Sequence, residues 1–561
     1  MEIDRQTEYE IRKYISGLVD NTIDKEIKKI LREDFKEFNK YELLCYSLIS
    51  IENEFKLDTF REGSMHQNAS NLRIILEWFI KFILKCYKIR KKGFTYTEDK
   101  YNKFQECITK MLFIYGNYAT NERFKQMRGI NKINIEINDE GEYHFKDSII
   151  EDDVDSRDNY FYGGYTSNEE FEKEKKAKGA ATIKIFQKYF VGKSKISTVD
   201  FFSFNEIDHE IFSLCKENIR VDIDKFGCGF NSAIFKDKET IINILGAFMY
   251  MAHVIVIKND FKSAIPGKII LFEKSVVTSK SKLINQLKKF FTISDDEINK
   301  IIDYFSLNND SRLGINEYPL INIDDYILWI PSSIMFNDFQ FSIVNGHYGK
   351  NIKIINHKET VAQSVVDKIV LACKKYDNII ISSDKPYADE QSKFNGEVLR
   401  GEIDVALYDT ISNSLLIIEC KWEDKLFVRG DQYKIICDEV NKIYKKQLEK
   451  DKYFLSLNIS NLDFIFSNDE GVKNRPYYPS NIQYIMIDKR IQLHSNGKHS
   501  LSEFNFLKII KDNSMNNTLR LDIIISYINS LETKVTYNTG NTRSTIDYEG
   551  KKIKNSIFTL I

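Results

Sequence analysis

Apolar residues recur every three or four positions through the first part of the chain. Ile11, Ile15 and Leu18 follow this spacing, and the segment 75–82 repeats it. A period near 3.6 residues is typical of helices that bury one face. We therefore predict a helical N-terminal domain over residues 1–135. We expect its apolar faces to pack against each other; the alternative is that they bind a partner protein or a second copy of the chain in a homo-oligomer.

The pattern changes after these predicted helices. Residues 136–178 carry many acidic residues and several glycines, so we interpret them as an acidic linker or mobile segment. Residues 179–350 combine helical spacing with two short apolar runs, at 253–258 and 268–273, which we expect to form strands. This mixture predicts an α+β middle domain.

The C-terminal third shows a regular succession of patterns. The expected elements are, in order, a helix at 357–376, strands at 378–383, 399–408 and 415–422, a helix at 437–454 and a strand at 482–488. They predict an α/β core with a central mixed sheet over residues 351–495. A C-terminal extension over residues 496–561 is expected to include a helix at 519–532. The fold class expected for the whole chain is multidomain α+β.

Composition fits a globular protein, because 42% of the residues are hydrophobic and 29% are charged. Lys and Arg total 81 against 82 Asp and Glu, so net charge favours neither a nucleic-acid partner nor a membrane surface. The eight cysteines include no CxxC pair, and the start MEIDRQTEYE lacks the apolar core of a secretory signal. We expect a cytoplasmic protein with no membrane segment.

Two common catalytic motifs are absent from the sequence. It contains neither the GxxxxGK[ST] loop that cradles nucleotide phosphates nor the GxSxG elbow of serine hydrolases. These observations argue against an ATPase and against a serine hydrolase.

The segment 396–424 gathers the candidate chemistry. Its two predicted strands form a β-hairpin, in which side chains alternate between faces. Glu402 and Asp404 are expected on one side of the first strand, and Glu419 and Lys421 on one side of the second. Two carboxylates and a lysine can therefore converge on one face of the hairpin.

The second strand is unusual because Glu419 and Lys421 directly follow the apolar run LLII. Such a run is typical of a strand that is buried on both faces. A carboxylate there is costly unless it is paired or binds a metal. The carboxylates of Asp404 and Glu419 are hard oxygen ligands of the kind that Mg²⁺ prefers.

Asp404, the hairpin that follows it and the run Glu419-Cys420-Lys421 resemble the D-x(n)-[DE]-x-K signature of the PD-(D/E)XK, or restriction-endonuclease-like, nuclease superfamily. The order of the predicted elements around this signature is similar to the core of that family. The resemblance implies Mg²⁺-dependent hydrolysis of phosphodiester bonds, with Mn²⁺ as a substitute. It also implies that Asp404, Glu419 and the carbonyl group of Cys420 hold the metal, and that Lys421 orients or deprotonates the attacking water.

Further residues follow from the same resemblance. Members of the family often place an acid on the first helix, a position that Glu359 matches, and Glu402 is a candidate for a further carboxylate. Gln447 is similar to the glutamine that some members carry after the lysine, although Tyr453 lies six residues further on rather than four. The chain has Ile403 where the family name places a proline.

The helix that follows the lysine is basic. Lys442, Lys445 and Lys446 are candidates for phosphate contacts, but acids such as Asp451 are interspersed, so a solvated lysine face is the alternative. We expect an endonuclease that cuts DNA, with RNA as an alternative substrate. By analogy it would be an effector of bacterial restriction or anti-phage defence, with the N-terminal domains providing recognition, assembly or regulation. The competing hypothesis is a non-catalytic nucleic-acid-binding or assembly module that keeps a nuclease-like fold.

Overall fold

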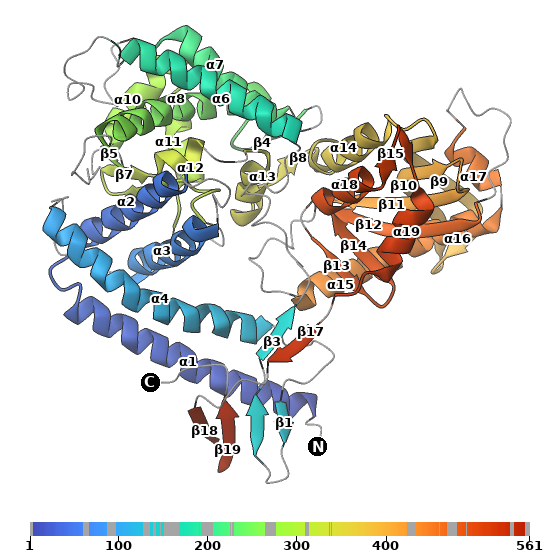
Figure 1. Cartoon of the computed structure of the whole chain (residues 1–561), viewed down its shortest axis with the longest axis horizontal. Helices are drawn as coiled ribbons and strands as arrows, with labels where there is room; N and C mark the ends of the chain where they lie inside the picture. Colours follow the sequence, from blue (N-terminus) through green and yellow to red (C-terminus); the bar gives the residue numbers. More distant parts are fainter. Residues whose placement is uncertain are drawn as a thin grey trace. The chain divides into compact units, whose positions relative to one another are not determined.

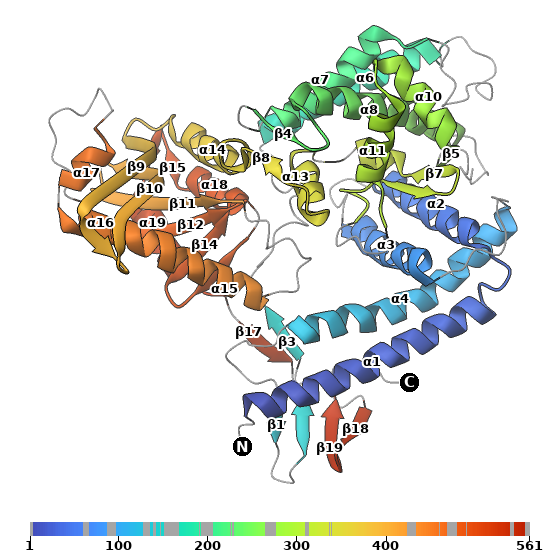
Figure 2. The same ribbon diagram turned by 180° about the vertical axis from the view of Figure 1, so that it is seen from behind.

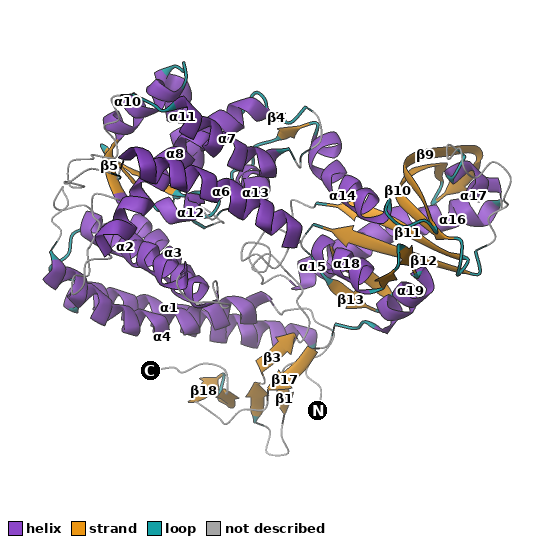
Figure 3. Cartoon of the chain, turned by 45° about the horizontal axis from the view of Figure 1, so that its top comes forward, coloured by secondary structure: helices purple, strands orange, loops and turns teal. Residues whose placement is uncertain are grey.

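A computed structural model of the chain describes residues 4–59, 67–86, 97–126, 135–137, 142–145, 147–150, 168–189, 191, 206–224, 226, 229–263, 276–308, 314–335, 337, 339–422, 433–458, 460–467, 479–489, 491–533, 535–538 and 544–555. These residues fold as a mixed α+β protein (Figure 3), which confirms the broad fold class expected from the sequence. The predictions at 268–273 and at the linker residues 151–167 lie outside the described residues.

Contacts within the chain divide it into two compact units, and each unit is discontinuous in sequence. One, here called the C-terminal unit, consists of Met1–Val19, Thr120–Tyr160 and Lys358–Ile561. The other, the middle unit, consists of Asp20–Ala119 and Phe161–His357. Two of the boundaries fall within α1 (Arg5–Glu33) and α4 (Glu98–Gln126), whereas the sequence suggested five successive segments.

The middle unit is mostly helical. Its other elements are α2 (Lys40–Thr59), α3 (Gln67–Cys86), α6 (Asn168–Tyr189), α7 (His209–Ile223), α8 (Lys238–Ser263), α10 (Lys280–Phe290), α11 (Asp295–Phe305), α12 (Pro331–Met335), α13 (Phe339–Gly349), β4 (Asn231–Ser232), β5 (Val277–Ser279), β6 (Leu320–Ile323), β7 (Tyr326–Trp329) and β8 (Ile354–Ile355). Local sequence sets some of the helix starts. Ser294 and Glu297, for example, form a capping box at the start of α11.

Helix α8 is the apolar centre of this unit. Among the described residues, only Lys238–Ile257 in α8 is long and apolar enough to cross a membrane, but 89% of that window is buried, as in the core helix of a soluble protein. The run 253–258 lies in α8, so the prediction of a strand there was wrong. A short apolar run without alternation fits a buried helix as well as a buried strand, and here the run continues a longer helical segment.

The C-terminal unit contains two small sheets that join distant parts of the sequence. Their strands are β1 (Ile135–Ile137), β2 (Tyr143–Phe145), β19 (Lys551–Asn555) and β18 (Ser544–Tyr548), in that spatial order, and the pair β3 (Asp147–Ile150) with β17 (Val535–Asn538). Helix α1 touches the first sheet, because the Tyr14 hydroxyl donates a hydrogen bond to the Asp547 carbonyl at 3.1 Å. Strands from the segment predicted as a linker therefore pair with strands from the end of the chain.

The main part of the C-terminal unit is a six-stranded mixed sheet. Its spatial order is β13 (Leu493–Ser495), β14 (Lys498–Ser502), β12 (Asn481–Asp488), β11 (Ser414–Lys421), β10 (Glu397–Asp409) and β9 (Ile379–Phe394). The pairs β9–β10, β10–β11 and β13–β14 are antiparallel, whereas β11–β12 and β12–β14 are parallel. The three strands predicted between residues 378 and 422 and the strand predicted at 482–488 are confirmed. The sheet also includes β14, which lies beyond residue 495.

Helices cover both faces of this sheet. The elements on one face are α15 (Tyr433–Ile443), the π-helical turn η3 (Tyr444–Leu448), α16 (Glu449–Leu457) and α17 (Ser460–Ile465). Those on the other are α14 (Gln363–Cys373), α18 (Glu503–Asp512) and α19 (Leu521–Ser530), with the π-helical turn η2 (Lys358–Ala362) leading into α14 and the hairpin β15 (Ser514–Met515)–β16 (Thr518–Leu519) preceding α19. Figure 1 shows α19 in front of the sheet. Figure 2, the opposite view, shows α15 and α16 in front of the other face.

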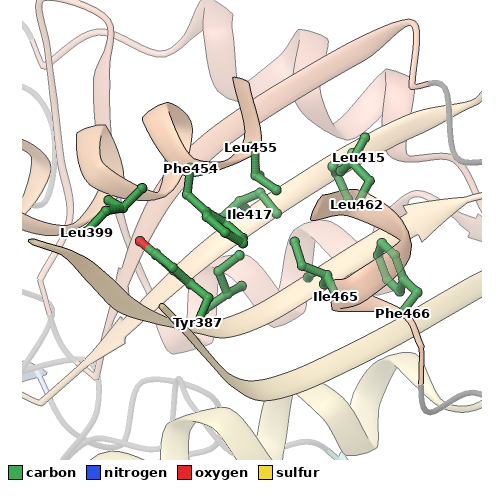
Figure 4. Close-up of a cluster of buried hydrophobic side chains, with 11 residues drawn as sticks. Tyr387, Leu399, Leu415, Ile417, Phe454, Leu455, Leu462, Ile465 and Phe466 are labelled. Carbon is green, nitrogen blue, oxygen red and sulfur yellow. The ribbon is translucent and has the colours of Figure 1, made fainter. Parts of the chain in front are cut away.

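An apolar cluster fixes helices α16 and α17 to the sheet. Figure 4 shows Phe454 and Leu455 of α16 against Ile417 of β11, with the Tyr387 ring of β9 facing Phe454. These side chains are buried, and burying a large apolar side chain stabilises a fold by about 1.5–3 kcal/mol. The cluster therefore holds α16 firmly beside the strands that carry the charged residues.

The turn between β10 and β11 also fixes α19. Buried Asp409 accepts hydrogen bonds from the Ile411 N–H at 2.9 Å and from the Leu521 N–H, the first of α19, at 3.2 Å. A carboxylate that accepts from the first N–H groups of a helix stabilises its start. The predicted helix at 519–532 is confirmed as α19, and it belongs to the same layered body as the hairpin.

Candidate active site

The three signature residues lie where the β10–β11 ladder ends. The paired residues run from Asp409↔Ser414 to Val405↔Ile418, so Asp404 and Glu419 follow the last pair. Asp404 Oδ2 accepts a hydrogen bond from the Cys420 N–H at 2.8 Å. Beyond the last pair, a bond from the backbone of β11 to the Asp404 side chain takes the place of the backbone hydrogen bonds between the strands. This bond fixes the Asp404 carboxylate beside β11.

Lys421 joins the two carboxylates. Its Nζ contacts Glu419 Oε1 and lies 3.9 Å from Asp404 Oδ2. The exposed fractions of the side chains are 3% for Glu419, 15% for Asp404 and 19% for Lys421. The three side chains therefore converge as the alternation of the hairpin predicted, with Glu419 inside and the other two nearer to solvent.

The charges of this triad do not balance, since two carboxylates face one ammonium group. Burial raises the pKa of Glu419 to about 8, repulsion from Asp404 adds to the shift, and Lys421 opposes it. Burial also raises the pKa of Asp404, although Lys421 and the Cys420 N–H act against that shift. One further positive charge, as a proton or a metal ion, would neutralise the triad.

Lys421 responds in the opposite direction. Burial alone would lower the pKa of Lys421, but the carboxylates of Glu419 and Asp404 outweigh burial and raise that pKa. The lysine is therefore held in its charged form, as a hydrogen-bond donor and a fixed positive charge.

The carboxylates fit Mg²⁺ in chemical type, but they do not form a complete cage. Among the described residues, no group of three or more His, Cys, Asp or Glu side chains is placed to hold a metal ion. Mg²⁺ commonly binds through one or two protein carboxylates and keeps several waters, so the pair Asp404 and Glu419 is sufficient in number. The Cys420 thiol is buried and burial raises its pKa, so the thiol is not a ligand here, and only the carbonyl group remains a candidate.

The acids predicted beside the triad are placed differently from one another. Glu402 is half-buried and contacts the ammonium group of Lys358, at the start of η2. Glu359 is exposed, and no contact among the described residues joins it to Asp404 or Glu419. The first helix reaches the site region instead through Gln363, whose Nε2 donates to Asp384 Oδ2 at 3.0 Å. The roles of Glu359 and Glu402 stay predictions.

The predicted residues on the following helices lie on η3 and α15. Gln447 is half-buried, and within the described residues no contact links it to the triad. Lys442 is paired with Glu439, whereas Lys445 and Lys446 are exposed. The two exposed lysines remain candidates for phosphate contacts.

A buried acid beside the triad was not predicted from the sequence. Asp451 of α16 has an exposed fraction of 2%, and its Oδ1 accepts a hydrogen bond from the Tyr387 hydroxyl at 2.6 Å. Burial raises the pKa of Asp451 to about 7, with the Tyr387 hydrogen bond opposing and repulsion from Asp404 adding to the shift. Asp451 in turn repels the Glu419 carboxylate.

A signal for Asp451 was present in the sequence. It lies three residues after Leu448 and three before Phe454, so it interrupts an apolar stripe at helical spacing. A charged residue in such a stripe has to be buried with the stripe or distort it. Its partner Tyr387 carried no comparable signal, because only the folding of β9 over α16 brings the two together.

Comparisons with known proteins gave no match. Protein-family models, curated proteins and solved structures were each searched with this chain, and none of the three searches returned a match. The site is therefore interpreted from its own geometry and from the signature described above.

Proposed function

We propose that the chain is a divalent-cation-dependent nuclease that hydrolyses phosphodiester bonds of DNA at Asp404, Glu419 and Lys421. The observation that carries the proposal is the convergence of two carboxylates and one lysine at the open end of a hairpin, with one negative charge in excess. The signature D-x(n)-[DE]-x-K and the succession α14, β9, β10, β11, α15–α16, β12 support it. The PD-(D/E)XK assignment itself rests on this signature and this order.

Asp404 and Glu419 would hold the cation, and a bound Mg²⁺ would polarise a phosphoryl oxygen and acidify its bound water. The raised pKa of Lys421 favours a particular role for this residue. A lysine that keeps its proton can donate a hydrogen bond to the attacking water or to a phosphoryl oxygen, and its charge stabilises the transition state. We therefore assign Lys421 an orienting and electrostatic role rather than that of a general base.

DNA is proposed over RNA from the resemblance alone. The same analogy suggests a cytoplasmic effector of bacterial restriction or anti-phage defence, in which residues 1–350 provide recognition, assembly or regulation. The exposed lysines Lys445 and Lys446 would contact phosphates.

A non-catalytic binding or assembly module is the second candidate. The ion pair between Lys421 and Glu419, together with the lack of a three-carboxylate cage among the described residues, favours it. The excess negative charge argues against it, because a buried carboxylate with a structural role is stable as an anion only when cations compensate its charge.

A cleavage assay separates the two candidates. Purified full-length protein is incubated with supercoiled plasmid, linear duplex, single-stranded DNA and RNA, in Mg²⁺, Mn²⁺ or EDTA. We expect cleavage of DNA with either cation and none in EDTA. Asp404→Asn, Glu419→Gln and Lys421→Ala should each lower the rate by about 10²–10³-fold or more, since each removes a charge from the reacting centre.

Asp463→Asn is the matched control for this assay. Asp463 is an exposed acid on α17 in the same unit, and its removal should leave the rate unchanged. Cation-dependent cleavage that survives all three site substitutions would overturn the site assignment. Binding of DNA with the same affinity in Mg²⁺ and EDTA, without cleavage, would support the binding module instead.

A further inference from the structure

We propose that Asp451 is a positioning residue that strengthens divalent-cation binding by Asp404 and Glu419 without touching the cation. This inference rests on the proposed function, because it concerns the same site. Its basis is a set of contacts that hold one buried carboxylate at a fixed place beside the triad.

The first contact is made by Tyr387, whose hydroxyl donates to Asp451 Oδ1 at 2.6 Å. The Tyr387 ring is stacked on Phe454, with ring centroids 4.0 Å apart and an interplanar angle of 10° (Figure 4). Phe454 lies one helical turn after Asp451 on α16. The same helix therefore holds both the acid and the ring that orients the hydroxyl.

Gly401 makes room for this arrangement. A Cβ atom on Gly401 would lie 2.3 Å from the Tyr387 hydroxyl oxygen and 2.9 Å from a ring carbon. The ring thus occupies the space that any other residue at position 401 would fill. Three strand and helix positions combine to direct one hydroxyl at one carboxylate.

The other oxygen of Asp451 is the informative one. Oδ2 is buried, and it has no hydrogen-bond partner in the described part of the chain. A fully buried carboxylate oxygen without a partner is costly, and such groups in folded proteins call for an explanation. If Asp451 served only to anchor Tyr387, a neutral amide or hydroxyl acceptor would do so at lower cost.

The position of Asp451 supplies the explanation. Tyr387 pairs with Gly401 on β10, three residues before Asp404, and Phe454 packs in one cluster with Ile417, two residues before Glu419. This packing holds Asp451 beside the triad, where its carboxylate adds negative charge near Glu419 and Asp404. Residues that surround metal ligands without touching the metal orient the ligands and tune affinity, and their substitution typically lowers metal affinity by about 10–100-fold. Asp451 would act through Glu419 in this way, and Tyr387 would keep it in place.

The test measures Mn²⁺ binding to the full-length protein by electron paramagnetic resonance of the free ion, with no substrate present. We expect wild type to bind and Asp404→Asn and Glu419→Gln to abolish binding. Asp451→Asn keeps an acceptor for Tyr387 but removes the charge, and it should weaken binding by about tenfold or more. Tyr387→Phe removes the hydroxyl but leaves the charge, so its effect should be smaller. Asp463→Asn controls for the loss of one carboxylate elsewhere in the unit.

A second variant guards against misfolding. Tyr387→Phe/Asp451→Leu removes both polar partners together, which leaves no buried group unpaired. It should stay folded by circular dichroism and still bind Mn²⁺ at least tenfold more weakly than wild type. Equal Mn²⁺ affinity for Asp451→Asn, this double variant and Asp463→Asn would overturn the role of Asp451 while the cation site stands. Wild type that fails to bind Mn²⁺, or binding that Asp404→Asn and Glu419→Gln leave unchanged, would overturn the cation site and this inference with it.

Discussion

Two groups of buried charges lie at the ends of neighbouring strands of the six-stranded sheet, and they differ in balance. The triad of Asp404, Glu419 and Lys421 has two carboxylates for one lysine. The second group, here called the structural cluster, consists of Glu503 at the start of α18, Lys489 after β12 and Lys368 of α14. It has two lysines for one carboxylate, with Lys489 Nζ 2.9 and 3.0 Å from the two Glu503 oxygens and Lys368 Nζ 3.1 Å from Glu503.

The surroundings of the two groups differ as well. In the structural cluster, both oxygens of Glu503 are hydrogen-bonded, and Lys489 also lies over the Trp422 ring at 5.1 Å. Burial would raise the pKa of Glu503, but Lys368 and Lys489 outweigh it and lower that pKa. The pKa of Glu419 moves the other way, to about 8. The buried carboxylate of Glu503 is therefore stable as an anion, whereas that of Glu419 lacks a cation to compensate its charge.

This contrast separates a structural role from a functional one by physical criteria. The structural cluster, in which both oxygens of the buried Glu503 carboxylate are bonded to lysines, holds α14 and α18 against the sheet. A cluster with excess negative charge, open toward solvent through Lys421 and Asp404, is less stable in the absence of a cation. Proteins keep such local instability mainly at functional sites.

The largest expected effect on stability comes from breaking the structural cluster. Glu503→Gln would leave the buried ammonium group of Lys489 without its carboxylate. Removing one partner of a buried ion pair typically costs about 3–5 kcal/mol. We expect a loss of this size in the free energy of unfolding, measured with urea and far-ultraviolet circular dichroism. A loss below that of an exposed pair would mean that this cluster is not the anchor described here.

The pH dependence of stability should distinguish the triad from the structural cluster. The pKa of Glu419 is raised from 4.5 to about 8, so the folded protein retains a proton that the unfolded chain releases in this window. In EDTA, stability should therefore fall as the pH rises through the window. Glu419→Gln lacks this dependence, so its stability relative to wild type should grow toward pH 8, by about 1.4 kcal/mol for each pH unit within the window.

Glu503 should show the opposite dependence. The pKa of Glu503 is lowered in the folded protein, so its contribution to stability is fully present above the unfolded pKa and is lost as the pH falls through the folded pKa.

Mg²⁺ should flatten the wild-type curve of stability against pH above neutral pH and leave the curve of Glu419→Gln unchanged. If wild type and Glu419→Gln gave parallel curves of stability against pH in EDTA, the excess of negative charge at the triad would be contradicted.

A smaller effect is expected where Gly401 meets Tyr387. Gly401→Ala places a methyl group against the ring, and overpacking of a buried site costs about 1–3 kcal/mol. The loss should shrink when Tyr387→Ala removes the ring, so a double-mutant cycle in urea unfolding measures the coupling. Independent, additive losses would show that the ring does not need the space above Gly401.

The smallest effect is expected for an exposed ion pair in the same unit. Arg520 and Asp522 lie 2.6 Å apart at the start of α19, with side chains 45% and 37% exposed. Pairs of this kind contribute about 0–1 kcal/mol and are screened by salt. Asp522→Asn should therefore change the free energy of unfolding by no more than this, and less in high salt. If Asp522→Asn lowered the free energy of unfolding as much as Glu503→Gln, burial would not explain why the structural cluster contributes more to stability than this exposed pair.

Local pattern was sufficient to predict much of the C-terminal unit. Alternation and turn residues gave the hairpin of β10 and β11, and they placed Asp404, Glu419 and Lys421 on one side. These are properties of neighbours in sequence. The prediction of a strand at 253–258 was wrong, because that short apolar run belongs to helix α8. Length and packing partners, not the run itself, decide between helix and strand in such cases.

The sequence by itself determined the hairpin, the helices on either side of it and the residue types that meet at its open end. Tertiary structure decided which charges are compensated, because compensation depends on contacts between residues far apart in the chain. Tyr387 reaches Asp451 across 64 positions, and Lys368 reaches Glu503 from a different helix. Burial and electrostatic pairing are properties of the packed layers. No sequence periodicity could therefore have shown that the buried carboxylate of the structural cluster is compensated by lysines while the triad is left with an excess of negative charge.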